Sequence, residues 1–230
     1  VPTHLGANLL TDPAVVKVEN VKTRVGDVIT LSAPLQAWEN VRQRGTDVLR
    51  GSRLLPQNHR IRPEDLFTLA ATGNAQIRVR KALRVAIFST GRELAAVETE
   101  ILRPGQIRNS SGPFLQAAFR RMGPGVAKVE YLGVIPDDPE IFEAKMRGVL
   151  DRGTDLILST GAVSMGQFDF VPASVQKLGG ETRFHKTAIR PGKPAFFAEF
   201  PGPGTAFFGV PGNPVSTAVG LRFFVEPWLR

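Results

Sequence analysis

Residues 156–169 read Leu-Ile-Leu-Ser-Thr-Gly-Ala-Val-Ser-Met-Gly-Gln-Phe-Asp. The stretch begins as a short apolar run, breaks into a turn of Gly, Ser, Thr and other small residues, and closes on a carboxylate. An apolar strand followed by a glycine-bearing loop and a single acid is how α/β proteins present backbone amides to an anionic ligand. The stretch therefore predicts a strand whose carboxyl end carries part of a binding site.

Two other segments repeat this plan of an apolar run that ends in a turn. Residues 83–88 lead into residues 89–93, Ser-Thr-Gly-Arg-Glu, and residues 206–210 lead into residues 211–214, Pro-Gly-Asn-Pro. Ligands of open parallel sheets bind beyond the carboxyl ends of the strands. We therefore expect the three strand ends to lie side by side and to form one pocket.

Strands and helices alternate from residue 83 onward, which predicts a parallel sheet. The patterns of apolar residues predict strands at 83–89, 126–132, 156–158, 182–189, 195–200 and 206–210, and helices at 114–122, 137–152, 171–178 and 215–228. The expected fold class is α/β: a three-layer α/β/α domain over residues 81–230, with a mostly parallel sheet.

The first part of the chain has a different character. Residues 1–50 read as part of a small β domain, with strands at 15–19 and 27–31 and a turn at 22–27. Residues 51–80 read as a connecting segment with one helix that begins near Arg62-Pro63-Glu64-Asp65 and stops at Gly73, followed by a strand at 76–80. The chain begins with Val-Pro and no Met, which suggests a fragment.

Composition narrows the class of protein. The 230 residues include no cysteine, which excludes disulfides and cysteine-bound metals, and the histidines at 4, 59 and 185 have no zinc-like spacing. No apolar run approaches the roughly 20 residues that span a bilayer, so a cytoplasmic protein without membrane contact is expected. The net charge of +8 is scattered along the chain, which favours a polyanionic small ligand over nucleic acid.

Several side chains suit an anionic ligand. Gly161 and Gly166 let the backbone approach an anion closely, and Ser164 can donate a hydroxyl. Asp169 suits either a sugar or pterin N–H, a divalent cation, or the start of the next helix, and the pattern leaves these alternatives open. A segment with two prolines carries three cations, which favours phosphate or oxyanion binding: Lys186, Arg190 and Lys193.

Two charged segments favour an ordinary structural role. Residues 137–139, Asp-Asp-Pro, are typical of a helix start. Arg42, Arg44 and Asp47 suit a phosphorylated ligand, but a surface turn is the favoured interpretation.

Five motifs in order over about residues 83–216 resemble the molybdopterin molybdotransferase family, which is related to the C-terminal domain of gephyrin. They are Phe-Ser-Thr-Gly-Arg-Glu-Leu, Gly-Val-Ile-Pro-Asp-Asp, Ser-Thr-Gly-Ala-Val-Ser-Met-Gly-Gln-Phe-Asp, Ile-Arg-Pro-Gly-Lys-Pro and Gly-Val-Pro-Gly-Asn-Pro-Val-Ser. The resemblance implies four active-site acids, Asp47, Glu93, Asp137 and Asp169, with Glu93 and Asp169 as ligands of Mg²⁺. It also implies a substrate-binding set consisting of Ser89, Thr90, Gly91, Thr160, Gly161, Ser164, Gly166, Lys186, Arg190, Lys193, Pro211, Gly212, Asn213 and Pro214.

The activity that the resemblance implies is Mg²⁺-dependent insertion of molybdate into adenylyl-molybdopterin with release of AMP. The family is usually a homodimer with its site between subunits, and a molybdopterin adenylyltransferase is a further expected partner. The first alternative is molybdopterin adenylylation, whose enzymes resemble this fold but carry Thr-Gly-Gly-Thr-Gly where this loop reads Thr-Gly-Ala-Val-Ser. The second is a non-catalytic molybdopterin-binding or scaffold module.

The chain departs from the family in three places. It lacks an Asp-Gly-aromatic-Ala motif and a small β domain after the last helix, and residues 109–111, Asn-Ser-Ser, stand where the family has an acid, a hydroxyl and Asn. A shortened chain of this kind suits the module alternative.

Overall fold

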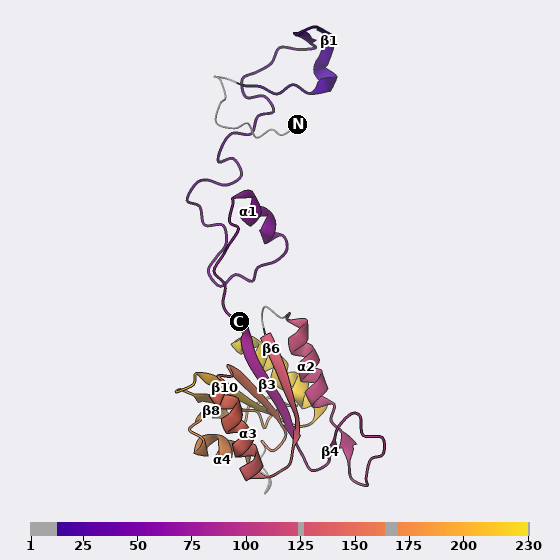
Figure 1. Ribbon diagram of the computed structural model, residues 1–230, viewed down its shortest axis with the longest axis vertical. Coiled ribbons are helices and arrows are strands. Elements are labelled where there is room, and N and C mark those ends of the chain that lie inside the picture. The colour runs from indigo at the N-terminus through magenta and orange to yellow at the C-terminus, as the bar shows by residue number, and fades with distance from the viewer. Residues whose placement is uncertain (1–12, 124–126, 164–169, 230) are drawn as a thin grey trace. The chain divides into compact units, whose positions relative to one another are not determined.

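The computed structural model describes residues 13–123, 127–163 and 170–229 (Figure 1). The chain divides into two compact units, residues 1–78 and residues 79–230. Each unit is described by itself.

The first unit contains a β-hairpin and one helix. Strands β1 (Val21–Val25) and β2 (Val28–Leu31) pair antiparallel after the single-turn 3₁₀ helix η1 (Val18–Asn20). The predictions of a strand at 15–19 and a turn at 22–27 are therefore wrong. The turn is confined to the two residues between the strands, where Gly26 has φ +56°, and the alternation of Val and Thr before it forms the strand.

Helix α1 (Asp65–Ala71) confirms the helix predicted in the connecting segment. The Asp65 carboxylate accepts a hydrogen bond from the Arg62 amide at 2.7 Å, and this bond is the main reason why the pKa of Asp65 lies below its usual value. Gly73 (φ +77°) ends the helix, as expected. The predicted strand at 76–80 is wrong, because the structure assigns no strand to these residues.

The second unit is built on a six-stranded sheet in the order β6-β3-β7-β10-β9-β8. Strands β3, β6, β8 and β10 of this sheet are labelled in Figure 1. Strands β6, β3, β7 and β10 are parallel, whereas β9 is antiparallel to both β10 and β8. This confirms the α/β fold with a mostly parallel sheet. The strands are β3 (Leu83–Thr90), β6 (Ala127–Ile135), β7 (Leu156–Thr160), β8 (Glu181–His185), β9 (Phe196–Phe200) and β10 (Thr205–Val210).

Helices cover both faces of the sheet, as the continuous burial of β7 and β10 requires. Leu158 faces a core cluster with helix α2 (Ser111–Arg121) and the π-helical turn η2 (Leu221–Val225). Ile157 faces a cluster with α3 (Pro139–Asp151) and α4 (Val171–Lys177). Adjacent residues of one strand thus serve opposite cores, because side chains alternate across a strand. Because both faces of the central strands are buried, their sequences are continuous apolar runs.

Several elements differ from their predicted bounds. Strand β8 ends at His185 because Lys186 adopts φ +71°, outside the β region. The C-terminal helix is α5 (Pro214–Gly220), a π-helical turn η2 (Leu221–Val225) and α6 (Glu226–Trp228). Pro227 has no N–H to donate to the carbonyl four residues earlier, which belongs to Phe223 of the π turn. Short strands β4 (Leu94–Ala95) and β5 (Ile107–Arg108) form a parallel pair that the sequence pattern does not predict.

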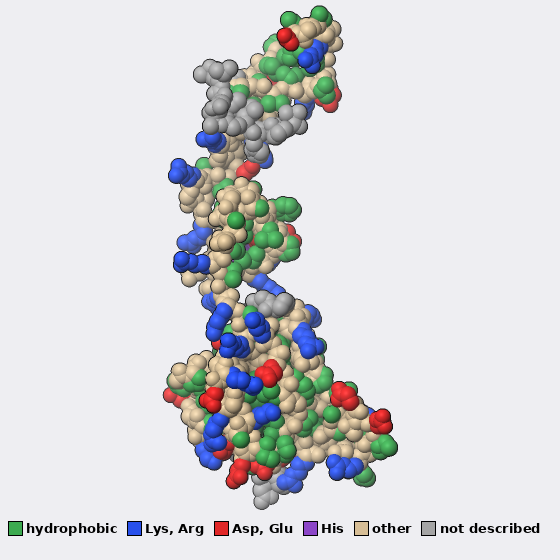
Figure 2. Space-filling model, in the orientation of Figure 1, with side chains coloured by type: hydrophobic (Ala, Val, Ile, Leu, Met, Phe, Trp, Pro, Cys, Tyr) green, Lys and Arg blue, Asp and Glu red, His purple; other side chains and the backbone are tan. Residues whose placement is uncertain are grey.

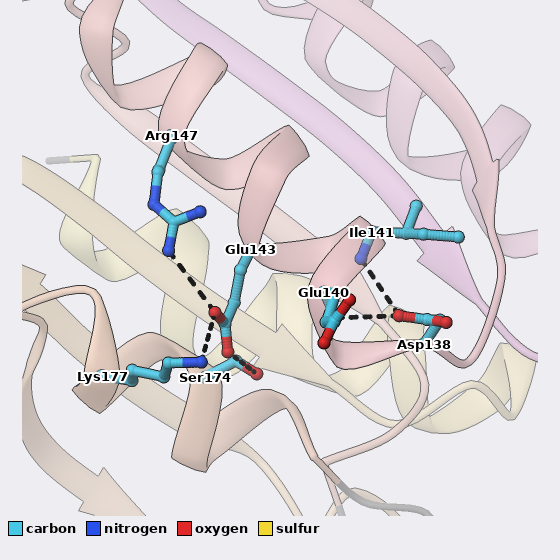
Figure 3. A network of polar contacts seen from close by, with 7 residues as sticks. All are labelled: Asp138, Glu140, Ile141, Glu143, Arg147, Ser174 and Lys177. Carbon is cyan, nitrogen blue, oxygen red and sulfur yellow. Dashed lines mark hydrogen bonds and ion pairs between the residues drawn. The ribbon is translucent and has the colours of Figure 1, made fainter.

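A buried carboxylate joins α3 to α4, and Figure 3 shows it pointing from one helix to the other. Glu143 is 4% exposed. It accepts from Lys177 Nζ at 2.8 Å and from Ser174 Oγ at 3.3 Å, both in α4, and Arg147 lies 3.5 Å away. This contact therefore holds α4 against α3.

We expect Glu143→Gln to lower the melting temperature by several degrees near neutral pH. The pKa of Glu143 lies below its ordinary value, chiefly because Lys177 donates to it. The contribution to stability is therefore complete above about 4.3, the ordinary pKa of Glu, and is lost as the pH falls through the lower folded pKa. Thermal unfolding of both proteins should show their difference shrinking under acid conditions.

Glu130→Gln is the matched control for this prediction. Glu130 pairs with Arg152 at 3.4 Å, but both side chains are 54% exposed, and exposed pairs contribute little. Equal melting temperatures for Glu143→Gln and Glu130→Gln would contradict the stabilising role of Glu143.

Candidate functional site

A cleft of about 650 Å³ lies at the carboxyl ends of β3, β7 and β10. These strands are neighbours in the sheet, which confirms that the three strand ends lie side by side. The residues that line the cleft are Thr90, Gly91, Arg92, Glu93, Leu94, Ile107, Asp137, Gly161, Ala162, Val163, Pro194, Pro211, Gly212, Asn213 and Pro214. A second hollow of about 610 Å³, beside the ends of α3 and α4 and residues 200–203, includes none of the candidate site residues.

The turn after β7 requires glycine at its first position. Gly161 has φ +90°, and its amide donates to the Val210 carbonyl at 3.0 Å. A Cβ at this position would lie 2.3 Å from the Thr90 carbonyl oxygen, closer than real Cβ contacts. The three strand ends are thus packed backbone against backbone, which lets main-chain groups form the floor of the cleft.

The turn after β3 places two carboxylates at the cleft. Gly91 has φ +152°, and a Cβ there would lie 2.8 Å from Glu93 Oε1, so the Glu93 carboxylate folds over the glycine. Asp137 Oδ2 accepts from the Arg92 amide at 3.0 Å and thereby ties the loop after β6 to this turn. Glu93 is exposed to solvent at the cleft.

The pair Asp137-Asp138 has two different roles. Asp138 Oδ1 accepts from the amides of Glu140 at 2.8 Å and Ile141 at 3.1 Å, so Asp138 caps α3 (Figure 3). Asp137 faces the cleft and contacts the turn after β3 instead. The helix-start interpretation is therefore right for the second acid and wrong for the first.

Two predicted substrate-binding hydroxyls lie beneath the cleft. Ser89 is 0% and Thr160 is 1% exposed, and their oxygens are 2.8 Å apart. Neither lines the cleft, and their contact with a ligand stays a prediction. The side-chain amide of Asn109 donates to Ser89 Oγ at 3.0 Å and to the Tyr131 hydroxyl, while its oxygen accepts from the Gly112 amide.

Helix α2 starts at residue 111, three residues before the predicted start. Ser110 is its N-cap residue, and the Asn109 side-chain oxygen accepts from the Gly112 amide at 3.2 Å in the first turn. Burial of Tyr131 raises the pKa of its hydroxyl, against the hydrogen bonds with Ser89 and Asn109. Residues 109–111 stand out in the sequence as a departure from the family motif, and no pattern predicts the contacts of Asn109 with Ser89 and Tyr131.

The turn after β10 also begins a helix. Asn213 Oδ1 accepts from the amides of Val215 at 3.0 Å and Ser216 at 3.4 Å and so caps α5. Gly212 lies against the turn after β7: a Cβ there would be 3.6 Å from the Gly161 Cα. The residues at 211–214 therefore form one wall of the cleft.

The three candidate cations lie between β8 and β9. Lys186, Arg190 and Lys193 are exposed, and none of them lines the cleft, although Pro194 does. The segment is closed by the amides of Lys186 and Thr187, which donate at 2.8 Å to the carbonyls of Ala195 and Lys193. In the view of Figure 2, Lys and Arg side chains are spread over the surface of residues 79–230, with Asp and Glu among them.

The remaining candidates cannot be placed at the cleft. Asp47 belongs to the first unit, where it forms an exposed ion pair with Arg42 at 3.0 Å. Ser164, Gly166 and Asp169 lie outside the described residues. Within the described ranges no three His, Asp or Glu side chains gather as metal ligands. In the same part of the chain, no helix is long and apolar enough to cross a membrane.

Comparisons with known proteins agree with this architecture. A family model described as "Probable molybdopterin binding domain" matches residues 86–230, and one described as "MoeA N-terminal region (domain I and II)" matches residues 11–73. A Synechococcus elongatus protein named "Molybdopterin molybdenumtransferase" is 43% identical over 215 residues, covering 94% of this chain and 52% of that protein. A Bacillus subtilis protein of the same name is 35% identical over 202 residues, covering 88% and 45%.

A solved structure also resembles this chain over most of its length. The crystal structure of the molybdopterin biosynthesis moea protein from Pyrococcus horikosii is similar with a TM-score of 0.75 and 29% identity, covering 94% of this chain and 52% of that one. The chain thus spans about half the length of the relatives that it matches.

Proposed function

The chain belongs to the family with a probable molybdopterin binding domain, and on this basis we propose that it inserts molybdate into adenylyl-molybdopterin with release of AMP. The observation that carries the proposal is the cleft itself. Main-chain groups of three adjacent strand ends form its floor, and the carboxylates of Glu93 and Asp137 lie at its edge. Such a site combines close approach of the backbone to a ligand with acids for chemistry.

The proposed division of roles follows the geometry. Thr90, Gly91, Gly161 and residues 211–214 bind the molybdopterin and adenylyl groups through the cleft surface. The cations at 186, 190 and 193 attract molybdate and phosphate, since oppositely charged groups steer an anion to its site. Ser89 and Thr160 support the strand ends from below.

Glu93 and Asp169 are proposed to hold Mg²⁺, with Asp47 and Asp137 as further active-site acids. The exposed carboxylate of Glu93 at the cleft fits the oxygen ligands that Mg²⁺ prefers. When bound, the ion would polarise the phosphoanhydride of the adenylyl group. Asp137 holds the turn that carries Glu93 through the Arg92 amide, and so sets where that carboxylate lies.

We also propose that the protein acts as a homodimer and receives its substrate from a molybdopterin adenylyltransferase. The second proposal follows from the chemistry, because the substrate of the insertion step is the adenylylated molybdopterin that such an enzyme makes.

The test is release of AMP from adenylyl-molybdopterin in the presence of molybdate and Mg²⁺, with omission of each as a control. Release of AMP that depends on molybdate supports the proposed reaction. Formation of adenylyl-molybdopterin from molybdopterin and ATP would instead assign the adenylyltransferase activity. Binding of adenylyl-molybdopterin without release of AMP would assign the non-catalytic module.

Asp169→Asn is expected to reduce molybdate insertion by about 100-fold or more, in the range of lost acid–base or metal-ligand groups. The motive is the position of Asp169 after the glycine-bearing loop of β7. The change preserves size and removes only the charge, so thermal unfolding should match the wild type. Wild-type activity of this variant in the AMP assay would remove Asp169 from the proposed site.

A further inference from the structure

Two buried hydroxyls lie under the turn after β10. Ser111, the first residue of α2, is 4% exposed, and Thr217 of α5 is 0% exposed. We propose that they are positioning residues, which orient the turn so that the amides of Gly212 and Asn213 bind an anionic oxygen of the ligand. The inference rests on the proposed function for the identity of that ligand, whose anionic oxygens are those of phosphate and molybdate.

The hydroxyls contact three successive carbonyl oxygens of the turn. Thr217 Oγ1 lies 2.8 Å from the Pro211 oxygen and 3.1 Å from the Asn213 oxygen. Ser111 Oγ lies 3.1 Å from the Gly212 oxygen, and the two hydroxyl oxygens are 3.2 Å apart. The carbonyls of residues 211–213 are therefore all turned toward the helices.

The direction of these carbonyls sets the direction of the amides. A trans peptide holds its C=O and N–H antiparallel, and the peptides within this turn are trans. With the Pro211 and Gly212 carbonyls facing the helices, the N–H groups of Gly212 and Asn213 face the other way. We infer that these N–H groups face the cleft, because residues 211–214 line it and the helices occupy the side of the carbonyls.

The sequence limits which backbone amides of residues 211–215 can donate to an anion. Pro211 and Pro214 have no N–H, and the Val215 amide donates to Asn213 Oδ1. Gly212 and Asn213 thus carry the donors of the turn itself. Two adjacent amides that point into one concavity form an anion-binding arrangement of the kind seen in phosphate sites.

Thr217→Val tests the proposal because it removes the hydroxyl and keeps the shape. Thr217→Ser is its matched control: it keeps the hydroxyl and removes a buried methyl group. Both changes are expected to lower the melting temperature, so stability alone does not separate them. Ser111→Ala removes the second hydroxyl with little change in volume and serves if Thr217→Val does not fold.

The readouts are the dissociation constant for adenylyl-molybdopterin and the ¹H–¹⁵N resonances of Gly212 and Asn213 in the full chain. AMP and molybdate are added in separate titrations to distinguish phosphate from molybdate as the bound anion. In the wild type and in Thr217→Ser, one of the two anions should shift both resonances. Thr217→Val and Ser111→Ala should weaken binding by about tenfold, as expected for loss of aligned donors to a charged group, and should suppress the shifts.

Equal affinities and equal shifts for Thr217→Val and Thr217→Ser would overturn the proposal. So would a wild-type protein in which neither anion moves these two resonances. Failure of the proposed function has a different signature, because a wild type that shows the shifts but releases no AMP retains the anion site without the reaction.

Discussion

Gly161→Ala is expected to lower the free energy of unfolding by about 3 kcal/mol or more, as for a strained backbone combined with overpacking, and to abolish ligand binding in the cleft. The new Cβ would lie 2.3 Å from the Thr90 carbonyl oxygen and 2.9 Å from Thr90 Oγ1. Backbone atoms cannot rotate away as the end of a flexible side chain can. The ends of β3 and β7 must therefore separate, and the floor of the cleft opens with them.

Gly204→Ala separates the two contributions to this effect. Gly204 also has positive φ, +69°, but a Cβ there would meet nothing within 4 Å. Its expected cost is about 1 kcal/mol, that of a left-handed conformation alone. Urea denaturation of both variants and a binding measurement with adenylyl-molybdopterin provide the comparison. Similar losses of stability in the two variants, with binding retained in Gly161→Ala, would contradict the close packing of the strand ends.

Glu93→Gln is expected to reduce release of AMP by about 100-fold or more, the range for a lost acid–base group or metal ligand. Its melting temperature should remain that of the wild type, since the side chain is exposed to solvent. The carboxylate is the group that suits Mg²⁺, and the amide keeps its shape without its charge. Initial rates over a range of Mg²⁺ concentrations are the measurement.

Glu100→Gln is the matched control, because Glu100 is exposed in the same excursion between β3 and α2 but does not line the cleft. It should leave both the rate and its dependence on Mg²⁺ unchanged. If Glu93→Gln and Glu100→Gln released AMP at the same rate, Glu93 would have no part in the reaction.

Much of the second unit follows from local patterns. Apolar runs predict β3, β7 and β10, because strands buried on both faces need continuous apolar sequence. The glycine turns that follow these runs predict that the carboxyl ends of the three strands lie together. The same reasoning fails in the first unit. Alternating Val and Thr at 21–25 and apolar residues at 15–19 look alike in sequence, and the strand forms where Val21 pairs with Leu31 across the hairpin.

The candidate site also has features that the sequence predicts and features that only the tertiary structure determines. A motif places Ser89 and Thr160 at strand ends, yet the pleat of each strand and the packing above it decide that both hydroxyls face inward, where they contact each other. Residues 137 and 138 are both Asp, so residue type alone does not distinguish their roles. Only the path of the chain into α3 assigns one to the helix cap and the other to the cleft.

Sequence alone therefore determines the plan of this protein: an α/β sheet whose glycine-bearing strand ends form a pocket. Each of these features is formed by residues that are close together in the sequence, so it can be recognised from a short stretch of the chain. The two buried hydroxyls under the turn after β10 could not be predicted in this way. Ser111 and Thr217 are 106 residues apart and meet 3.2 Å from each other, and a serine or threonine in a helix looks the same whether its hydroxyl is solvated or holds a turn. Tertiary packing alone brings these hydroxyls to the carbonyls of the turn, because the hydrogen bonds exist only after α2 and α5 have docked on the sheet.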